Sequence, residues 1–76
     1  MTIRDVVITH LLEAGCTELE PTKKYRVFNR VGTDGKFFVG KMGALRAGTS
    51  VTDSISLATG RGAIAWAWKY SSRRAG

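Results

Sequence analysis

The sequence predicts a small α+β domain in which an N-terminal helix packs on an antiparallel sheet of three to five strands. Two observations predict this class. Apolar residues recur at helical spacing near the start of the chain, and residues 24–48 alternate as two consecutive β-hairpins do. Nine glycines among 76 residues also indicate many turns and therefore a sheet-rich chain. We expect a single small domain over residues 1–76, because a chain of this length buries only one modest core.

Residues 2–14 are predicted to form the helix. Its apolar side chains at helical spacing are Ile3, Val7, Leu11 and Ala14. Thr2 and Asp5 stand three residues apart, which is the spacing of a capping box at a helix N-terminus. Gly15 follows the last turn, where a left-handed glycine commonly ends a helix.

Residues 24–48 are predicted to form the two hairpins. Residues 32–35 supply the first turn, and Asp34-Gly35 within them is a strong hairpin signal, because glycine accepts positive φ at little cost. Residues 41–43 supply a second tight turn. Side chains alternate between the two faces of a strand, so we expect Arg26 and Arg30 to surround Phe28 and Phe38 on one exposed face.

The chain after residue 48 is predicted less uniquely. Residues 50–57 alternate between apolar and polar side chains, which indicates a further strand with one solvent-exposed face. Residues 63–70 carry large side chains at every second position: Ile64, Trp66, Trp68 and Tyr70. That alternation favours a strand, whereas the intervening alanines favour a helix. We favour the strand and keep the helix as the alternative. Residues 71–76 are expected to be a short, mobile basic tail.

The charge is distributed unevenly along the chain. The formal net charge is +6. Residues 1–20 hold one basic and four acidic residues, a net charge of −3, whereas residues 21–76 hold eleven basic and two acidic residues, a net charge of +9. A basic segment of this kind indicates a polyanionic partner, although net charge also serves solubility.

No catalytic, metal-binding or cofactor-binding constellation is visible in the sequence, so we expect a protein that is not an enzyme and takes no cofactor. His10 is the single histidine and Cys16 the single cysteine. The predicted helix ends between them, which argues against a Cys–His pair. A single cysteine excludes an intramolecular disulfide and indicates a reducing, cytoplasmic setting. The sequence contains no run of eighteen apolar residues, so we expect no membrane partner.

The predicted function is binding of nucleic acid, because basic and aromatic residues interleaved on a sheet can hold phosphates and stack bases. The candidate binding residues are Arg26, Phe28, Arg30, Lys36, Lys41 and Arg46. The alternative for the phenylalanines is a place in the core. The alternative function is a protein-binding accessory factor, such as an inhibitor or adaptor of a phage or other mobile element, that binds an acidic protein surface. Trp66 and Trp68 would then anchor the partner, unless they complete the core.

Overall fold

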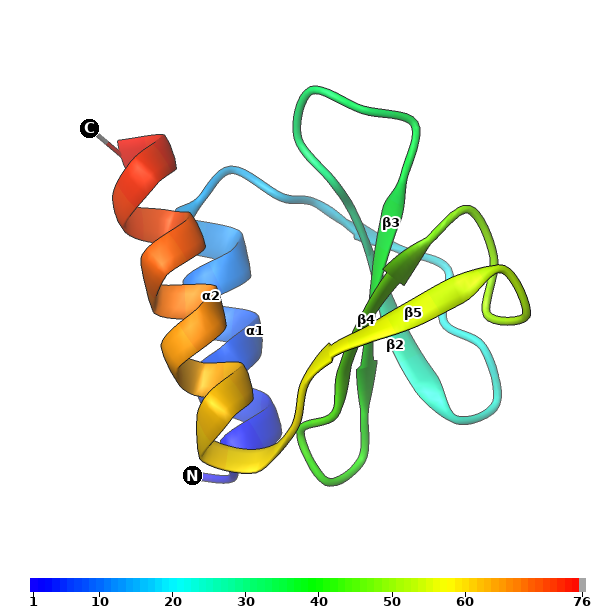
Figure 1. Ribbon diagram of the computed structural model, residues 1–76, viewed down its shortest axis with the longest axis horizontal. Coiled ribbons are helices and arrows are strands. Elements are labelled where there is room, and N and C mark those ends of the chain that lie inside the picture. Colours follow the sequence, from blue (N-terminus) through cyan, green and yellow to red (C-terminus); the bar gives the residue numbers. More distant parts are fainter. Residues whose placement is uncertain (76) are drawn as a thin grey trace.

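The computed structural model describes residues 1–75 and contains two helices and a five-stranded antiparallel sheet (Figure 1). In chain order the elements are α1 (Ile3–Glu13), β1 (Glu18–Leu19), β2 (Tyr25–Asn29), β3 (Lys36–Gly40), β4 (Leu45–Gly48), β5 (Ser54–Ala58) and α2 (Gly60–Ala75). Each strand pairs with the next along the chain, in the order β1-β2-β3-β4-β5. The α+β class with an N-terminal helix on an antiparallel sheet is therefore confirmed.

The two helices lie side by side on one side of the sheet and run in the same direction (Figure 1). The main core fills the space between them and the sheet. Its buried side chains include Val7, Leu11, Phe28, Phe37, Val39, Leu45, Ala63 and Ala67. Two helices and the three central strands thus share one apolar core, whose burial is the main source of stability in so small a chain.

Helix α1 begins and ends close to where the sequence predicts. The Thr2 hydroxyl accepts a hydrogen bond from the Asp5 backbone N–H, and the Asp5 carboxylate accepts one from the Thr2 backbone N–H. This capping box lowers the pKa of Asp5, mainly through the hydrogen bonds from Thr2. Gly15 follows the helix with φ of 98°, in the left-handed region that glycine occupies without steric cost.

The register of the hairpins corrects the predicted exposed face. Phe28 pairs with Phe37 across β2 and β3, whereas Phe38 pairs with Val27. Phe28 and Phe38 therefore point to opposite faces of the sheet, and both are buried, at 0% and 2% exposed. Phe28 lies in the main core under the helices. The expectation that Phe28 and Phe38 share one exposed face is wrong.

The sheet face opposite the helices is also covered, by residues of the β1–β2 connection and of the β4–β5 connection. Val27 and Phe38 are buried there, and they line a hollow together with Leu19 from β1 and Val51 from the β4–β5 connection. Tyr25 packs edge-on against Phe38, with 6.2 Å between ring centroids. A small second apolar cluster therefore covers the face opposite the helices, where Phe38 was expected to be exposed.

The predicted strand over residues 50–57 is only partly correct. Strand β5 spans Ser54–Ala58, and the residues before it form turns. The Ser50 hydroxyl accepts a hydrogen bond from the Asp53 backbone N–H, and the Ser54 hydroxyl donates one to the Val51 carbonyl. These local side-chain hydrogen bonds compete with strand pairing, as serine commonly does in turns.

The strand prediction for residues 63–70 is wrong, because these residues lie within helix α2. Ala63 and Ala67, one helical turn apart, are both fully buried in the core. Their small side chains allow α2 to lie close to its neighbours. The residues predicted as a mobile tail continue the helix to Ala75, and Gly76 lies outside the described residues.

The large alternating residues point in different directions from α2, as a helix requires. Trp66 and Tyr70 lie one turn apart and both contact Phe37 of the sheet. Trp68 projects elsewhere and is 56% exposed. The period-two pattern therefore reflects two separate faces of one helix rather than one face of a strand.

Candidate nucleic-acid interface

The structure does not bring the predicted binding residues onto one surface. Arg26 and Lys41 line one hollow, Lys36 lines a second and Arg30 a third. Phe28 is fully buried and has no face free for a base. Each hollow is therefore a separate candidate site.

Five basic residues from separate segments surround the first hollow, which has a volume of about 520 Å³. We call it the basic hollow and define it by Arg4, Lys23, Lys24, Arg26 and Lys41. Arg4 comes from the first turn of α1, the two lysines from the β1–β2 connection, Arg26 from β2, and Lys41 from the turn after β3. Three stretches that are distant in sequence, at residue 4, residues 23–26 and residue 41, thus bring positive charge to one site.

Two tight turns hold the lysines of the basic hollow. The Thr22 backbone N–H donates to the Tyr25 carbonyl at 3.0 Å, and the Tyr25 N–H donates to the Thr22 hydroxyl at 3.3 Å. The intervening Lys23 and Lys24 therefore sit at the tip of a closed turn. Lys41 follows β3 in a turn closed by a 2.8 Å hydrogen bond from the Gly40 N–H to the Ala44 carbonyl.

One carboxylate offsets part of this charge. Arg26 donates two hydrogen bonds to Glu18, at 2.8 and 2.6 Å. The hydrogen bond from Arg26 lowers the pKa of Glu18, and the same bond raises the pKa of Arg26. The pair is about one-third exposed on each side, so it is partly screened by solvent and contributes little to stability.

The other four cations of the basic hollow form no ion pair among residues 1–75. The Nε atom of Arg4 is buried and has no hydrogen-bond partner. That buried atom is not open to a ligand, whereas the side chains of Lys23, Lys24 and Lys41 are exposed. The hollow therefore has a net positive charge and unused donors, which suit a polyanion.

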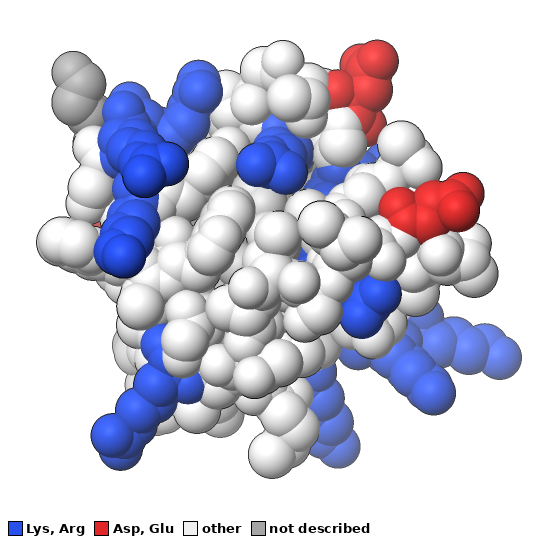
Figure 2. Space-filling model, viewed as in Figure 1, with Lys and Arg blue, Asp and Glu red and all other residues white. Residues whose placement is uncertain are grey.

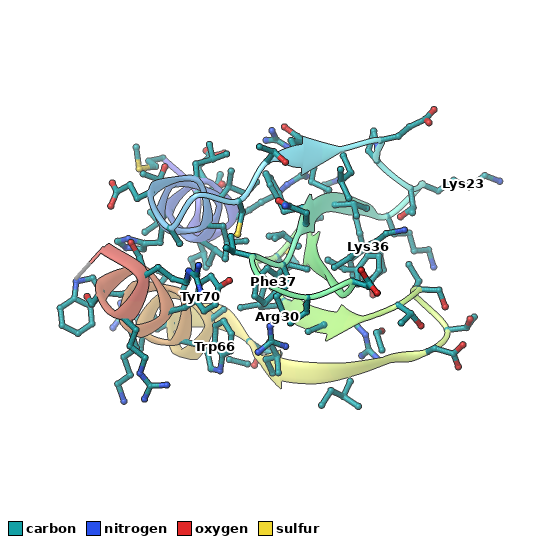
Figure 3. All side chains as sticks on the ribbon, turned by 90° about the horizontal axis from the view of Figure 1, so that it is seen from above. Lys23, Arg30, Lys36, Phe37, Trp66 and Tyr70 are labelled. Atoms are coloured by element: carbon teal, nitrogen blue, oxygen red, sulfur yellow. The ribbon has the colours of Figure 1, made fainter. Side chains whose placement is uncertain are left out.

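Lys36 and Arg46 are not part of this arrangement. The Arg46 guanidinium donates hydrogen bonds to the Ser54 hydroxyl at 2.9 Å and to the Ser54 carbonyl at 2.8 Å. Arg46 therefore ties β4 to β5. Lys36 is the first residue of β3 and lines the second hollow beside the β4–β5 connection, and Figure 3 shows it away from Trp66.

The two tryptophans that the sequence offered as alternative partner anchors do not form a single anchor. Trp66 is partly buried and stacks on Tyr70, with 5.5 Å between ring centroids. Trp68 lies outside the main core and is largely exposed. Of the two, Trp66 alone lines one of the three hollows described, together with Arg30, Lys69, Tyr70 and Arg73.

His10 and Cys16 lie in different surroundings. The Nδ1 atom of His10 lies 3.9 Å from the Glu13 carboxylate. Cys16 is buried in the core, and this burial raises the pKa of its thiol, which disfavours the nucleophilic thiolate. Within residues 1–75 no group of three or more histidine, cysteine or acidic side chains could hold a metal ion.

Sequence reasoning missed several residues of the hollows: Arg4, Lys23, Lys24, Lys69, Tyr70 and Arg73. The Lys23-Lys24 pair beside Tyr25 was a visible signal of basic and aromatic residues together. Arg4 gave no such signal, because it lies in a segment whose net charge is negative.

No model of a known protein family, no curated protein and no solved structure matches this chain. Neither of the helices described is both long enough and apolar enough to cross a membrane.

Proposed function

We propose that the protein is a non-catalytic module that binds nucleic acid by holding the phosphate backbone in the basic hollow. The observation that supports this most directly is the convergence of Arg4, Lys23, Lys24 and Lys41, none of which is neutralised by a carboxylate within the described chain. Backbone phosphates release condensed counterions when lysine and arginine replace them, which favours binding to such a site.

The test is a salt titration of binding to a fluorescent single-stranded oligonucleotide of random sequence. For single strands, the slope of log affinity against log salt is about −0.7 for each phosphate neutralised, so four contacts predict a slope of about −3. Lys24→Ala and Lys41→Ala should each make the slope shallower by about one contact, with similar effects on any sequence.

Arg61→Ala is the matched control, because it removes the same charge from an exposed residue that lines none of the three hollows described. For Arg61→Ala, the slope of log affinity against log salt should stay nearly unchanged. Absence of binding at low salt, or equal effects of Lys41→Ala and Arg61→Ala, would exclude the basic hollow as the binding site.

The second candidate is an acidic protein surface bound by the same hollow. One observation favours it: Met42, in the hollow's lining, is 82% exposed, and exposed methionine suits adaptable protein contacts. The equilibrium affinity of a protein complex would depend only weakly on salt, because charge would act mainly on the association rate. Met42→Ala would then weaken binding, whereas phosphate binding would be insensitive to it.

A further inference from the structure

The third hollow, of about 150 Å³, lies between the end of β2 and one face of α2. We call it the aromatic hollow and define it by Arg30, Trp66, Lys69, Tyr70 and Arg73. The residues from α2 recur at intervals of three and four positions, so they share one face of that helix. Figure 3 shows Arg30, Trp66 and Tyr70 together beside Phe37, away from Lys23 of the basic hollow.

The aromatic rings of this site are held rigidly. Trp66 and Tyr70 stack with an interplanar angle of 16°. The Phe37 ring meets both nearly at right angles, at centroid distances of 5.6 Å to Trp66 and 5.2 Å to Tyr70. Because Phe37 is fully buried, it fixes the two partly exposed rings from below. A ring fixed in this way loses little conformational entropy when a ligand stacks on it.

Three cations surround these rings. The Arg30 guanidinium lies 5.3 Å from the centroid of Phe37, which orients it at the edge of the hollow. Lys69 and Arg73 are exposed on α2, and none of the three forms an ion pair among residues 1–75. Figure 2 shows basic side chains gathered over the C-terminal half of α2, while the acidic residues visible on that face lie on the opposite side.

We infer that the aromatic hollow binds an unpaired nucleotide, with the base stacked against Trp66 and the phosphate held by Arg73, Lys69 and Arg30. A flat π surface combined with several cations matches both parts of a nucleotide. A base within a duplex has no free face, so this site selects single strands. The inference deepens the proposed function, and it rests on that function only for the class of ligand.

The experiment uses the two tryptophans as separate reporters. In Trp68→Phe, Trp66 is the sole tryptophan, and adenosine monophosphate should quench its fluorescence. In Trp66→Phe, only the outward Trp68 remains, and the same nucleotide should leave its fluorescence nearly unchanged. Quenching that is equal in the two variants, or absent in Trp68→Phe, would overturn the proposal.

The phosphate part is tested by comparing adenosine monophosphate with adenosine. Adenosine should bind Trp68→Phe more weakly, and adding Arg73→Ala should bring the affinity for the nucleotide close to that for the nucleoside. Arg74→Ala is the matched control, because Arg74 is an exposed neighbour that does not line the hollow. Equal effects of the two substitutions, with folding verified by circular dichroism, would contradict the assignment.

The two sites are separable. Lys41→Ala should weaken oligonucleotide binding and leave the quenching of Trp66 by adenosine monophosphate unchanged. Trp66→Leu should reduce single-strand affinity on the order of 5- to 150-fold, the range found for loss of one stacked base. If the oligonucleotide complex is salt-dependent but adenosine monophosphate does not quench Trp66, the basic hollow is retained as a binding site and the aromatic hollow is rejected. If adenosine monophosphate quenches Trp66 but no oligonucleotide complex forms, the aromatic hollow is retained and the basic hollow is rejected.

Discussion

The backbone of Gly43 lies directly against the side chain of Ile3, so a Cβ atom at Gly43 would overlap Cγ2 of Ile3. Gly43 also has φ of 89°, in the left-handed region. This contact joins the β3–β4 turn to the first turn of α1. It therefore also sets the relative positions of Lys41 and Arg4 on two sides of the basic hollow.

The first prediction is that Gly43→Ala destabilises the protein by about 2–5 kcal/mol, the sum of a left-handed conformation and local overpacking. Gly32→Ala is the matched control, because Gly32 also has positive φ, 82°, but nothing lies within 4 Å of its added Cβ. It should cost only the conformational part, about 1–2 kcal/mol. Urea unfolding of both variants measures the difference, and equal losses would mean that the contact with Ile3 is not tight.

The second prediction concerns the packing of α1. Leu11 is fully buried in the main core, so Leu11→Ala should lower the free energy of unfolding by about 2–5 kcal/mol. Its neighbour Leu12 is 50% exposed, and Leu12→Ala should change stability by no more than about 0.5 kcal/mol. Thermal or chemical unfolding of the pair separates burial from helix propensity, which is the same for both substitutions. Similar midpoints would contradict the packing of α1.

The sequence predicted the elements whose signals are local. The Thr2–Asp5 capping box is fixed by residues three positions apart, and the helix follows from it. The first hairpin lies where predicted, but the left-handed glycine of its turn is Gly32, with φ of 82°, and not Gly35, whose carbonyl accepts a hydrogen bond from the Arg30 N–H. Helix α2 was expected only as the alternative to a strand, because its state depends on long-range packing. Ala63 and Ala67 carry no directional signal until the rest of the core is in place against them.

For the candidate site, the sequence predicted the types of residue but not which of them are exposed or lie together. Basic and aromatic residues were expected, but Arg46 is engaged with Ser54, and Phe38 is buried by connections from both ends of the sheet. Whether a residue on a strand faces solvent depends on what covers that face, which alternation alone does not show. The approach of Arg4 to Lys41 follows from tertiary structure, since they lie in segments far apart in the chain.

The third prediction concerns the single thiol. Burial raises the pKa of Cys16 above its ordinary value of 9.0, so less thiolate is present at neutral pH. Native protein should react with a thiol reagent clearly more slowly than denatured protein does, and the rate should rise until the pH passes that higher pKa. Rapid reaction of the folded protein near neutral pH would show that Cys16 is more accessible than its 3% exposure indicates.

The fourth prediction concerns Glu18, the carboxylate that neutralises Arg26 in the basic hollow. Glu18→Gln removes the negative charge and frees the Arg26 guanidinium, so affinity for single-stranded oligonucleotides should rise. The slope of log affinity against log salt should steepen by about 0.7, one additional phosphate. Stability should change by no more than about 1 kcal/mol, because the ion pair is exposed. Glu13→Gln is the control, since Glu13 has no contact with the hollow.

The pH dependence of oligonucleotide affinity is an independent measurement of the role of Glu18. Arg26 lowers the pKa of Glu18 below 4.5, so the carboxylate stays charged at neutral pH and its contribution to stability is present there. That contribution is lost as the pH falls through the lowered pKa. Protonation also frees Arg26, so oligonucleotide affinity of the native protein should rise over this acidic range towards that of Glu18→Gln. The variant lacks the titrating group and should show a smaller rise. Parallel pH profiles for the two proteins would mean that Glu18 does not restrain Arg26, and lower affinity of the variant at neutral pH would exclude Arg26 as a phosphate ligand.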